Sequence, residues 1–323
     1  MTTLPPTAIA GAHPRNQSLG IACGVGAGAL WGLVFLAPEL VREFSPLLLS
    51  IGRYLCYGLI AAAMLAPRWR TLVAGLPRRR WLDLFWLSLC GNTLYYVLLS
   101  SAVQTGGIAM TSLVIGFLPV AVTIIGSRDH DAVPLAKLLP SLLACAAGAV
   151  CIGWQALAHP AAAGGSGQRL AGLACAVGAL ASWTAYAVGN ARCLARLRQV
   201  SAHEWNLLTG LVTGAQNLAL VPLALVLETS RHGDGGWARF GAVSVGVAVL
   251  ASIGGNGLWN RMSRLLPLTL VGQMILFETL FALLYGWLWE RRLPSLPETA
   301  ALAFVATSVL TCLSAHRRHP SGA

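Results

Sequence analysis

Charged residues are scarce in this chain of 323 residues, since Asp, Glu, Lys and Arg together make up only 10% of it. A soluble domain carries about 25% of them. That class is therefore excluded, and a hydrophobic content of 56% predicts a protein that crosses a membrane many times. The net charge of +11 is interpreted as loop residues that orient the chain in the bilayer, and no nucleic-acid partner is expected.

The apolar segments also lack the residue sets of enzymes, metal proteins and ion channels. All seven histidines lie in predicted loops or tails, and no two of the eight cysteines are spaced as CxxC. No Ser/His/Asp set, phosphate loop, ring of like charges or carbonyl filter is visible in these segments. We therefore expect a protein that is not an enzyme, with no metal and no cofactor.

Long apolar runs are what the chain does have. A run of about 20 apolar residues matches a hydrocarbon core about 30 Å thick. The N-terminus lacks the basic start of a signal peptide, so the first run is expected to stay in place as a span. The predicted fold is an all-α integral membrane protein with ten transmembrane helices, at 18–37, 46–66, 81–103, 107–126, 134–157, 169–190, 204–227, 240–260, 267–289 and 296–315.

The organisation around these spans is expected to be simple. A linker rich in Ala, Gly and Ser, 158–168, separates two halves of five spans each, 18–157 and 169–316. Tails are predicted at 1–17 and 317–323. Most Lys and Arg residues fall in loops on the side of the N-terminus, which predicts a bacterial-type inner (plasma) membrane protein with both termini cytoplasmic.

The two halves resemble each other in sequence. Gly28-Ala29-Leu30 is echoed by Gly178-Ala179-Leu180, and Ala102–Pro119 aligns with Met262–Thr279. An odd number of spans per half forces the second half to be inverted in the membrane. Inverted 5+5 repeats are typical of transporters, whose substrate binds near the middle of the bilayer between the halves.

Polar and aromatic side chains recur at helical spacing inside the spans. Unpaired amides are costly in hydrocarbon, so these faces are expected to turn inward, either as hydrogen bonds between helices or as a wet cavity walled by aromatic rings. A polar stripe from Asn206 to Asn217 in span seven is read in the same way. The predicted substrate-binding or gating residues are Trp31, Asn92, Tyr95, Tyr96, Trp183, Tyr186, Trp259 and Glu278.

Two charges lie inside spans. Glu278 is a carboxylate deep in an apolar run, where insertion costs roughly 3 kcal/mol, so it is expected to face protein or water. It is a candidate to carry a coupling proton, to bind a substrate ammonium or to hydrogen-bond a neighbour. Arg53 in span two is interpreted mainly as structural, through snorkelling or pairing with a helix end.

Small residues and proline mark the expected packing and hinge positions. Gly24, Gly28 and Gly32 form a ridge in span one that lets another backbone approach closely, either as static packing or as a sliding surface. Pro119 in span four is expected to kink its helix.

These motifs resemble the EamA-type exporters of the drug/metabolite transporter superfamily, and most closely the bacterial aromatic amino acid exporter branch. The similarity covers about 20–316 and rests on Trp31-Gly32 in span one, Arg53, Pro119 and Glu290-Arg291 after span nine. The chain departs from the pattern where Ser127-Arg128 replaces the first Glu-Arg pair, and where Glu278-Thr279 stands in place of Glu-Pro. The resemblance implies ten helices, an inverted repeat and efflux of small metabolites.

The predicted function is therefore export of aromatic and other large neutral amino acids and related metabolites, by alternating access through a midplane cavity. The expected partners are a small-molecule substrate and the lipid bilayer, and the chain is expected to act as a monomer or weak homo-oligomer. Two alternatives stay open: a broad drug or quaternary-cation pump that uses Glu278, and a non-transporting membrane enzyme or assembly factor. A single deep carboxylate leaves both proton coupling and passive flux possible.

Overall fold

The computed structural model describes residues 14–73, 76–127, 133–158, 166–197, 200–228, 233–291 and 293–317. Within these ranges the regular structure is entirely helical, which confirms the predicted all-α class. Most of the predicted tails and of the linker 158–168 lie outside the described residues. Seven helical stretches in the described ranges are long and apolar enough to cross a membrane: Gln17–Leu40, Pro46–Leu72, Arg78–Gly106, Leu170–Arg196, Ala202–Leu227, Asp234–Leu265 and Leu268–Trp289.

The helical elements follow one another with short connections. In chain order they are α1 (Pro14–Gly32), η1 (Leu33–Phe35), α2 (Ala37–Leu40), α3 (Pro46–Leu65), η2 (Ala66–Arg68), α4 (Trp69–Leu72), α5 (Arg78–Ser88), η3 (Leu89–Thr93), α6 (Leu94–Ile115), α7 (Leu118–Gly126), α8 (Leu135–Ala158), α9 (Ser166–Arg196), α10 (Ala202–Leu227), α11 (Asp234–Val247), η4 (Ala248–Gly255), α12 (Asn256–Leu265), α13 (Leu268–Met274), α14 (Leu276–Glu290) and α15 (Leu296–Arg317).

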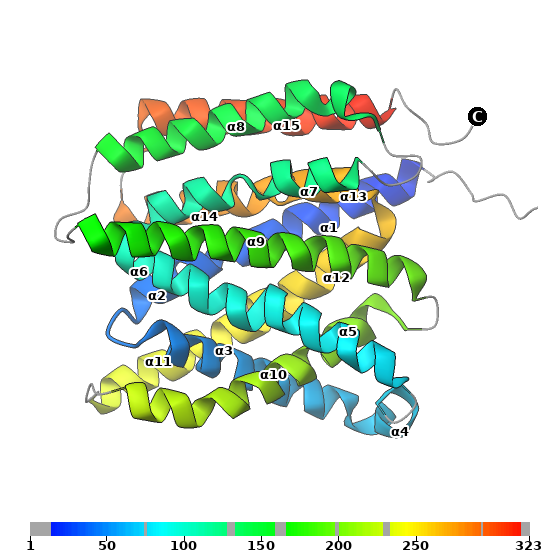
Figure 1. Cartoon of the computed structure of the whole chain (residues 1–323), viewed down its shortest axis with the longest axis vertical. Coiled ribbons are helices and arrows are strands. Elements are labelled where there is room, and N and C mark those ends of the chain that lie inside the picture. The colour runs from blue at the N-terminus through cyan, green and yellow to red at the C-terminus, as the bar shows by residue number, and fades with distance from the viewer. Residues whose placement is uncertain are drawn as a thin grey trace, which may run out of the picture.

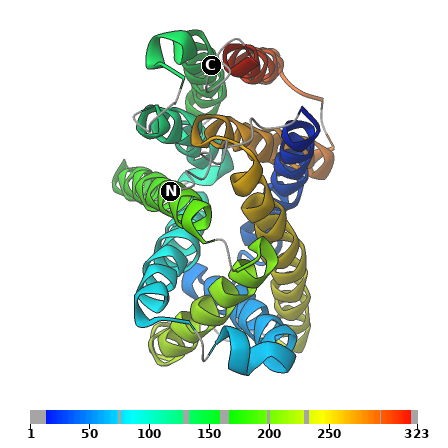
Figure 2. The ribbon, with the colours of Figure 1, turned by 90° about the vertical axis from the view of Figure 1, so that its right-hand side faces the viewer.

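The helices are stacked in layers with roughly parallel axes (Figure 1). At one end of the long axis α8 packs against α15, and at the other end α3 packs against α10 and α11. Between them lie α1, α6, α9 and α12 to α14, which carry most of the predicted site residues (Figures 1 and 2). α1 begins and α15 ends on the same face of the molecule in Figure 1, while the membrane side to which that face belongs stays a prediction.

The boundary predicted between spans three and four falls where the apolar stretch Arg78–Gly106 ends. A turn was expected at 104–106, but α6 continues through this segment to Ile115. The helix ends there because Pro119, four residues later, has no N–H to donate to the carbonyl of Ile115. Pro119 lies in the first turn of α7, where a missing N–H costs nothing. The expected kink is therefore a complete helix break, at 116–117.

The apolar run around Glu278 is also interrupted. α13 ends at Met274 and α14 begins at Leu276, and the amide of Glu278 donates to the carbonyl of Ile275 at 3.0 Å, a tighter pattern than the α-helical one. Glu278 therefore lies in the first turn of α14 instead of in the middle of a regular helix. A carboxylate is favoured there by the positive end of the helix dipole.

Within the described ranges two π-helical turns occur, η3 in the first half of the chain and η4 in the second. Such turns insert an extra residue, and they are frequent at functional sites. They also leave backbone carbonyls open to side chains of other helices. In η4 the carbonyl of Ala251 accepts from Trp31 Nε1 at 3.1 Å, and in η3 the carbonyl of Cys90 accepts from Ser182 Oγ at 2.7 Å.

The glycine ridge of α1 packs on the backbone of span nine. A Cβ atom at Gly28 would lie 2.8 Å from the amide nitrogen of Glu278, and one at Gly32 would lie 2.9 Å from that of Ala282. Gly24 packs in the same way on the side chain of Met274. The ridge thus provides a close helix contact that a larger side chain cannot make, and it fixes α1 directly against the first turn of α14.

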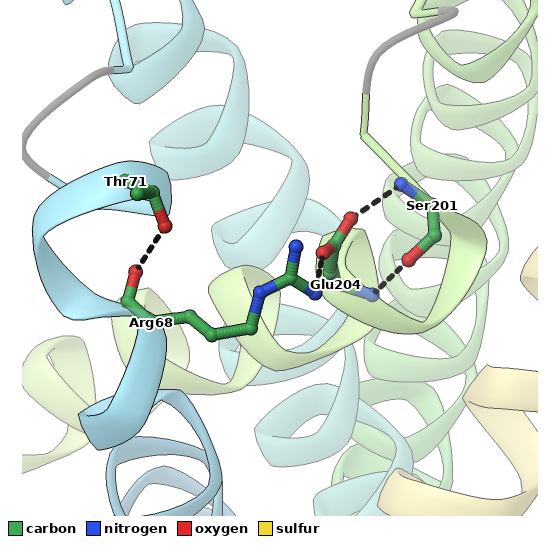
Figure 3. A network of polar contacts seen from close by, with 4 residues as sticks. All are labelled: Arg68, Thr71, Ser201 and Glu204. Carbon is green, nitrogen blue, oxygen red and sulfur yellow. Dashed lines mark hydrogen bonds and ion pairs between the residues drawn. The ribbon is translucent and has the colours of Figure 1, made fainter.

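A polar network joins the end of span two to the start of span seven (Figure 3). Ser201 and Glu204 form a capping box at the N-terminus of α10, with Ser201 N donating to Glu204 Oε2 at 2.8 Å and Glu204 N donating to Ser201 Oγ at 3.0 Å. The other carboxylate oxygen of Glu204 pairs with Arg68 at the end of η2. One carboxylate therefore both caps α10 and anchors the chain that follows α3.

Candidate functional site

Three indole rings from three helices meet at the centre of the molecule. Trp31 near the end of α1 lies 5.7 Å from Trp183 of α9 and 5.0 Å from Trp259 of α12, measured between ring centroids. Trp183 and Trp259 are 5.1 Å apart, and all three side chains are buried. Aromatic pairs at such separations contribute about 0.5–1.5 kcal/mol each beyond the burial of their area, so the three rings hold one another in place.

A small cavity adjoins this indole cluster and is lined from both halves of the chain. About 20 Å³ of it is open to the centre of a water-sized sphere, and holding one water takes roughly 10–15 Å³ on this measure. A larger solute therefore enters only if the surrounding side chains or helices move apart. The lining residues are Trp31, Val34, Arg53, Tyr54, Gly91, Asn92, Tyr95, Trp183, Tyr186, Asn256 and Glu278.

Each π-helical turn offers a glycine to an aromatic ring at the cavity wall. A Cβ atom at Gly91 in η3 would lie 2.3 Å from the ring of Tyr186, and one at Gly255 in η4 would lie 2.6 Å from Trp31 Nε1. An asparagine follows each glycine, and Asn256 Oδ1 accepts from Trp31 Nε1 at 3.0 Å. The extra residue in each helix thus allows a ring from the other half to approach the backbone.

Arg53 of α3 is buried and is held by its surroundings. Its Nε donates to Ser252 Oγ in η4 at 3.0 Å. Its guanidinium carbon lies 4.8 Å from the ring centroid of Tyr54 and 4.4 Å from that of Tyr96. Cation–π contacts of this kind favour a desolvated guanidinium. The expectation of snorkelling or of pairing with a helix end is not met, because Arg53 faces the central cavity.

Glu278 faces the same cavity from α14 and is 4% exposed. It interacts electrostatically with Arg53 and Tyr95, yet among the described residues no ion pair or hydrogen bond to its carboxylate is found. Asn92 Nδ2 and the hydroxyl of Tyr95 are likewise buried without a hydrogen-bond partner in the described part of the chain. Buried polar groups are normally satisfied, so these atoms suit a ligand or water.

The structure gathers most of the predicted site residues but not all at the cavity. Trp31, Asn92, Tyr95, Trp183, Tyr186 and Glu278 line it. Tyr96 lies behind the wall against Arg53, and Trp259 supports the two cavity indoles. That any of them contacts substrate stays a prediction.

Sequence reasoning missed several lining residues. Arg53 was recognised as a buried charge but was not placed at the cavity, and Tyr54 beside it was not considered. Asn256 was not among the predicted site residues. Gly91 carries no sequence signal of its own, because its role depends on the ring of Tyr186 from another helix.

The polar stripe of span seven bonds helix to helix instead of lining the cavity. Asn206 Nδ2 donates to the carbonyl of Ile253 at 3.1 Å, and Asn217 Nδ2 donates to Thr93 Oγ1 at 2.9 Å. Gln216 Nε2 donates to the carbonyl of Phe85 at 2.8 Å. Amide side chains of this kind stabilise helix association in membranes, so the hydrogen-bonding interpretation holds for this helix.

Comparison with known proteins agrees with this architecture. Residues 18–154 match the model of the EamA-like transporter family. The inner membrane protein YtfF of Escherichia coli (strain K12) is 31% identical over 312 residues, which cover 93% of this chain and 97% of YtfF. A solved crystal structure with 18% sequence identity superposes with a TM-score of 0.69 over 93% of this chain and 99% of its own, and shows the same fold. The chain belongs to the EamA-like transporter family of the drug/metabolite transporter superfamily.

Proposed function

We propose that this chain exports aromatic and other large neutral amino acids and related metabolites across the inner membrane, by alternating access through the central cavity. The observation that carries the proposal is the cluster of Trp31, Trp183 and Trp259 beside a cavity that also holds Tyr95 and Tyr186. Indole and phenol rings offer an apolar face for stacking and one polar tip for a hydrogen bond. A planar amino acid side chain fits that chemistry.

Ten spans in an inverted 5+5 repeat are part of the proposal. Its support is the pairing of elements across the two halves 18–157 and 169–316: α3 with α10, α7 with α13, and α8 with α15. The π-helical turns η3 and η4 add to it, since each presents a Gly-Asn step to a ring from the opposite half. Repeats of this kind place the substrate between the halves.

The small volume of the cavity makes a conformational step necessary. About 20 Å³ is available, so an amino acid binds only after the halves rock apart on one side. Transport by rocking predicts that solute on the far side of the membrane accelerates exchange, because a loaded carrier returns.

Counterflow in proteoliposomes tests this function. Labelled tryptophan is expected to accumulate transiently in vesicles that hold the full chain and unlabelled tryptophan, and to do so several-fold less with Trp183→Ala or Tyr95→Ala. Trp69→Ala, at an exposed site on α4, is the matched control and is expected to keep the wild-type rate. Equal rates in wild type and both cavity variants would count against the site.

A second candidate is favoured by one observation, the position of Glu278 close to the indole cluster. Aromatic rings with a carboxylate are suited to quaternary cations, so a cation pump is the alternative. It predicts that labelled tetraphenylphosphonium is exported by wild type and not by Glu278→Gln, while neutral amino acids are unaffected by that change. Loss of tryptophan counterflow in Glu278→Gln would argue against the cation pump.

A further inference from the structure

We propose that Arg53 and Glu278 recognise the two ends of a zwitterion, with the Arg53 guanidinium on the substrate carboxylate and the Glu278 carboxylate on its ammonium. The inference rests on the proposed function and makes it more specific. It requires a solute that carries both charges on one carbon, with its side chain against the indole cluster.

The first observation is that these two opposite charges share one small cavity without neutralising each other directly. Both line it, and they interact electrostatically, but no ion pair joins them in the described part of the chain. A buried charge pair without a direct contact lacks the Coulombic gain that offsets desolvation. A zwitterion placed between the two side chains would supply the missing contacts to both.

The second observation is that Arg53 is oriented for an external acceptor. Ser252 takes only its Nε, and the ring of Tyr96 packs on the guanidinium. Among the described residues no carboxylate bonds to its remaining nitrogens, which leaves the planar fork that binds a carboxylate with two hydrogen bonds. Asn92 Nδ2 and the Tyr95 hydroxyl are further donors that find no partner in the part of the chain that the structure describes.

The third observation is the charge balance of the cavity. Among the described lining residues Arg53 is the one basic side chain and Glu278 the one acidic side chain, so with Glu278 ionised the fixed charges sum to zero. A cation at Glu278 meets Arg53 as a like charge, and an anion at Arg53 meets Glu278 as a like charge. Like charges repel more strongly in a low-dielectric cavity than in water, which disfavours amines, organic cations and organic acids relative to free amino acids.

Competition for labelled tryptophan measures this preference, both in counterflow and in binding to the detergent-purified full chain. The competitors are tryptophan, tryptamine, which lacks the carboxylate, and indole-3-propionate, which lacks the ammonium. In wild type both analogues are expected to compete at least tenfold more weakly than tryptophan. Equal competition by all three compounds would overturn the inference. If tryptophan is still transported in that case, the proposed function stands.

The variants assign each end. Arg53→Gln is expected to narrow the gap between tryptophan and tryptamine to less than threefold and to leave the gap for indole-3-propionate. Glu278→Gln is expected to do the opposite. Arg68→Gln is the control, because it removes an arginine outside the cavity. It is expected to change neither the tryptophan-to-tryptamine ratio nor the tryptophan-to-indole-3-propionate ratio.

A merely structural role for Arg53 and Glu278 predicts that all three ligands weaken by the same factor, and that result would overturn the inference. Thermal unfolding in detergent checks that each variant is folded. If a variant fails to fold, the wild-type competition ratios still decide. Absence of both flux and binding of tryptophan would overturn the proposed function together with the inference.

Discussion

Trp259 supports the cavity wall without lining the cavity itself. Its ring packs on Trp31 at 5.0 Å and on Trp183 at 5.1 Å, and its own exposure is 1%. It therefore fixes the position of the two indoles that form the cavity wall. A change at this position reaches the site through those two rings.

Truncation of Trp259 tests this supporting role. Trp259→Ala removes two ring contacts and leaves a void, and such changes cost about 3–5 kcal/mol. We expect a fall of several degrees in the unfolding temperature in detergent and a rise in KM for tryptophan counterflow. Trp259→Phe keeps a ring and should lose much less of both. An unchanged KM in Trp259→Ala would show that the two indoles keep their positions without it.

For single residues, the sequence predicts the position of those side chains that recur at helical spacing within one span. Trp183 and Tyr186 are three positions apart on α9, so one face presents both, and the structure places both at the cavity. Tyr95 and Tyr96 are neighbours about 100° apart around their helix, and of the two only Tyr95 reaches the cavity. Arg53 could not be placed, because its direction depends on Ser252 and Tyr96 from other helices.

At the scale of elements, the glycines of α1 bring this helix into close contact with α14. A methyl group at Gly28 would meet backbone atoms of Phe277 and Glu278 at 2.8 Å. Backbone cannot turn aside as a flexible side chain does. The ridge of glycines therefore determines where the first turn of α14, with its carboxylate, lies relative to α1.

Gly28→Ala is expected to push Glu278 away from its position. Overpacking costs about 1–3 kcal/mol, so both the unfolding temperature in detergent and tryptophan counterflow should fall. Gly286→Ala on α14 is the matched control, because a Cβ atom there meets nothing within 4 Å. If Gly28→Ala and Gly286→Ala transport equally well, the close approach of α1 does not position Glu278.

The capping box of α10 separates two roles of Glu204. Glu204→Gln keeps a side chain able to cap the helix but removes the ion pair with Arg68, whose side chain is 63% exposed; exposed pairs contribute about 0.2–1 kcal/mol. Glu204→Ala also removes the hydrogen bond that Glu204 Oε2 accepts from Ser201 N, which adds about 0.5–1.5 kcal/mol. We expect thermal unfolding to rank the wild type above Glu204→Gln, and Glu204→Gln above Glu204→Ala. Equal loss in both variants would assign the whole effect to the ion pair.

The boundaries of the helices are only partly predictable from the sequence. Pro119 predicts a helix break from the sequence alone, because its missing N–H removes a hydrogen bond within its own helix. The uninterrupted α6 up to Ile115 was not expected. Nothing in the composition marks η3 or η4, since a π-helical turn is stabilised by partners such as Trp31 and Ser182 from distant helices. The apolar run 267–289 likewise gives no sign of the break at Ile275.

At the scale of the whole molecule, the connections alternate between two faces of the helical stack. In Figure 1, α4, the end of α9 and the start of α10 lie on the face where α1 begins and α15 ends. The sequence predicts that this arginine-rich face is cytoplasmic. The opposite face carries α2, the end of α10 and the start of α11 (Figure 1).

Labelling of single introduced cysteines tests the orientation. In inside-out membrane vesicles an impermeant maleimide is expected to modify Arg70→Cys, which is exposed on α4, and to spare Arg42→Cys, which is exposed beside α2. Intact spheroplasts should give the reverse. The unsubstituted chain is the blank, because its eight cysteines are free but lie in buried or half-buried positions. The same pattern in both preparations would contradict the predicted topology.

The geometry of the cavity depends on the extra residue that each π-helical turn, η3 and η4, inserts into its helix. Removing one position from a π-helical turn would restore a regular helix and rotate everything on one side of it by about 100°. In span three such a deletion would turn Asn92 and Tyr95 relative to α5, and carry them off the wall they now form. Replacing an apolar side chain leaves the rotation of its helix unchanged, whereas the loss of a single peptide unit at either of these two places would turn the lining residues out of the cavity.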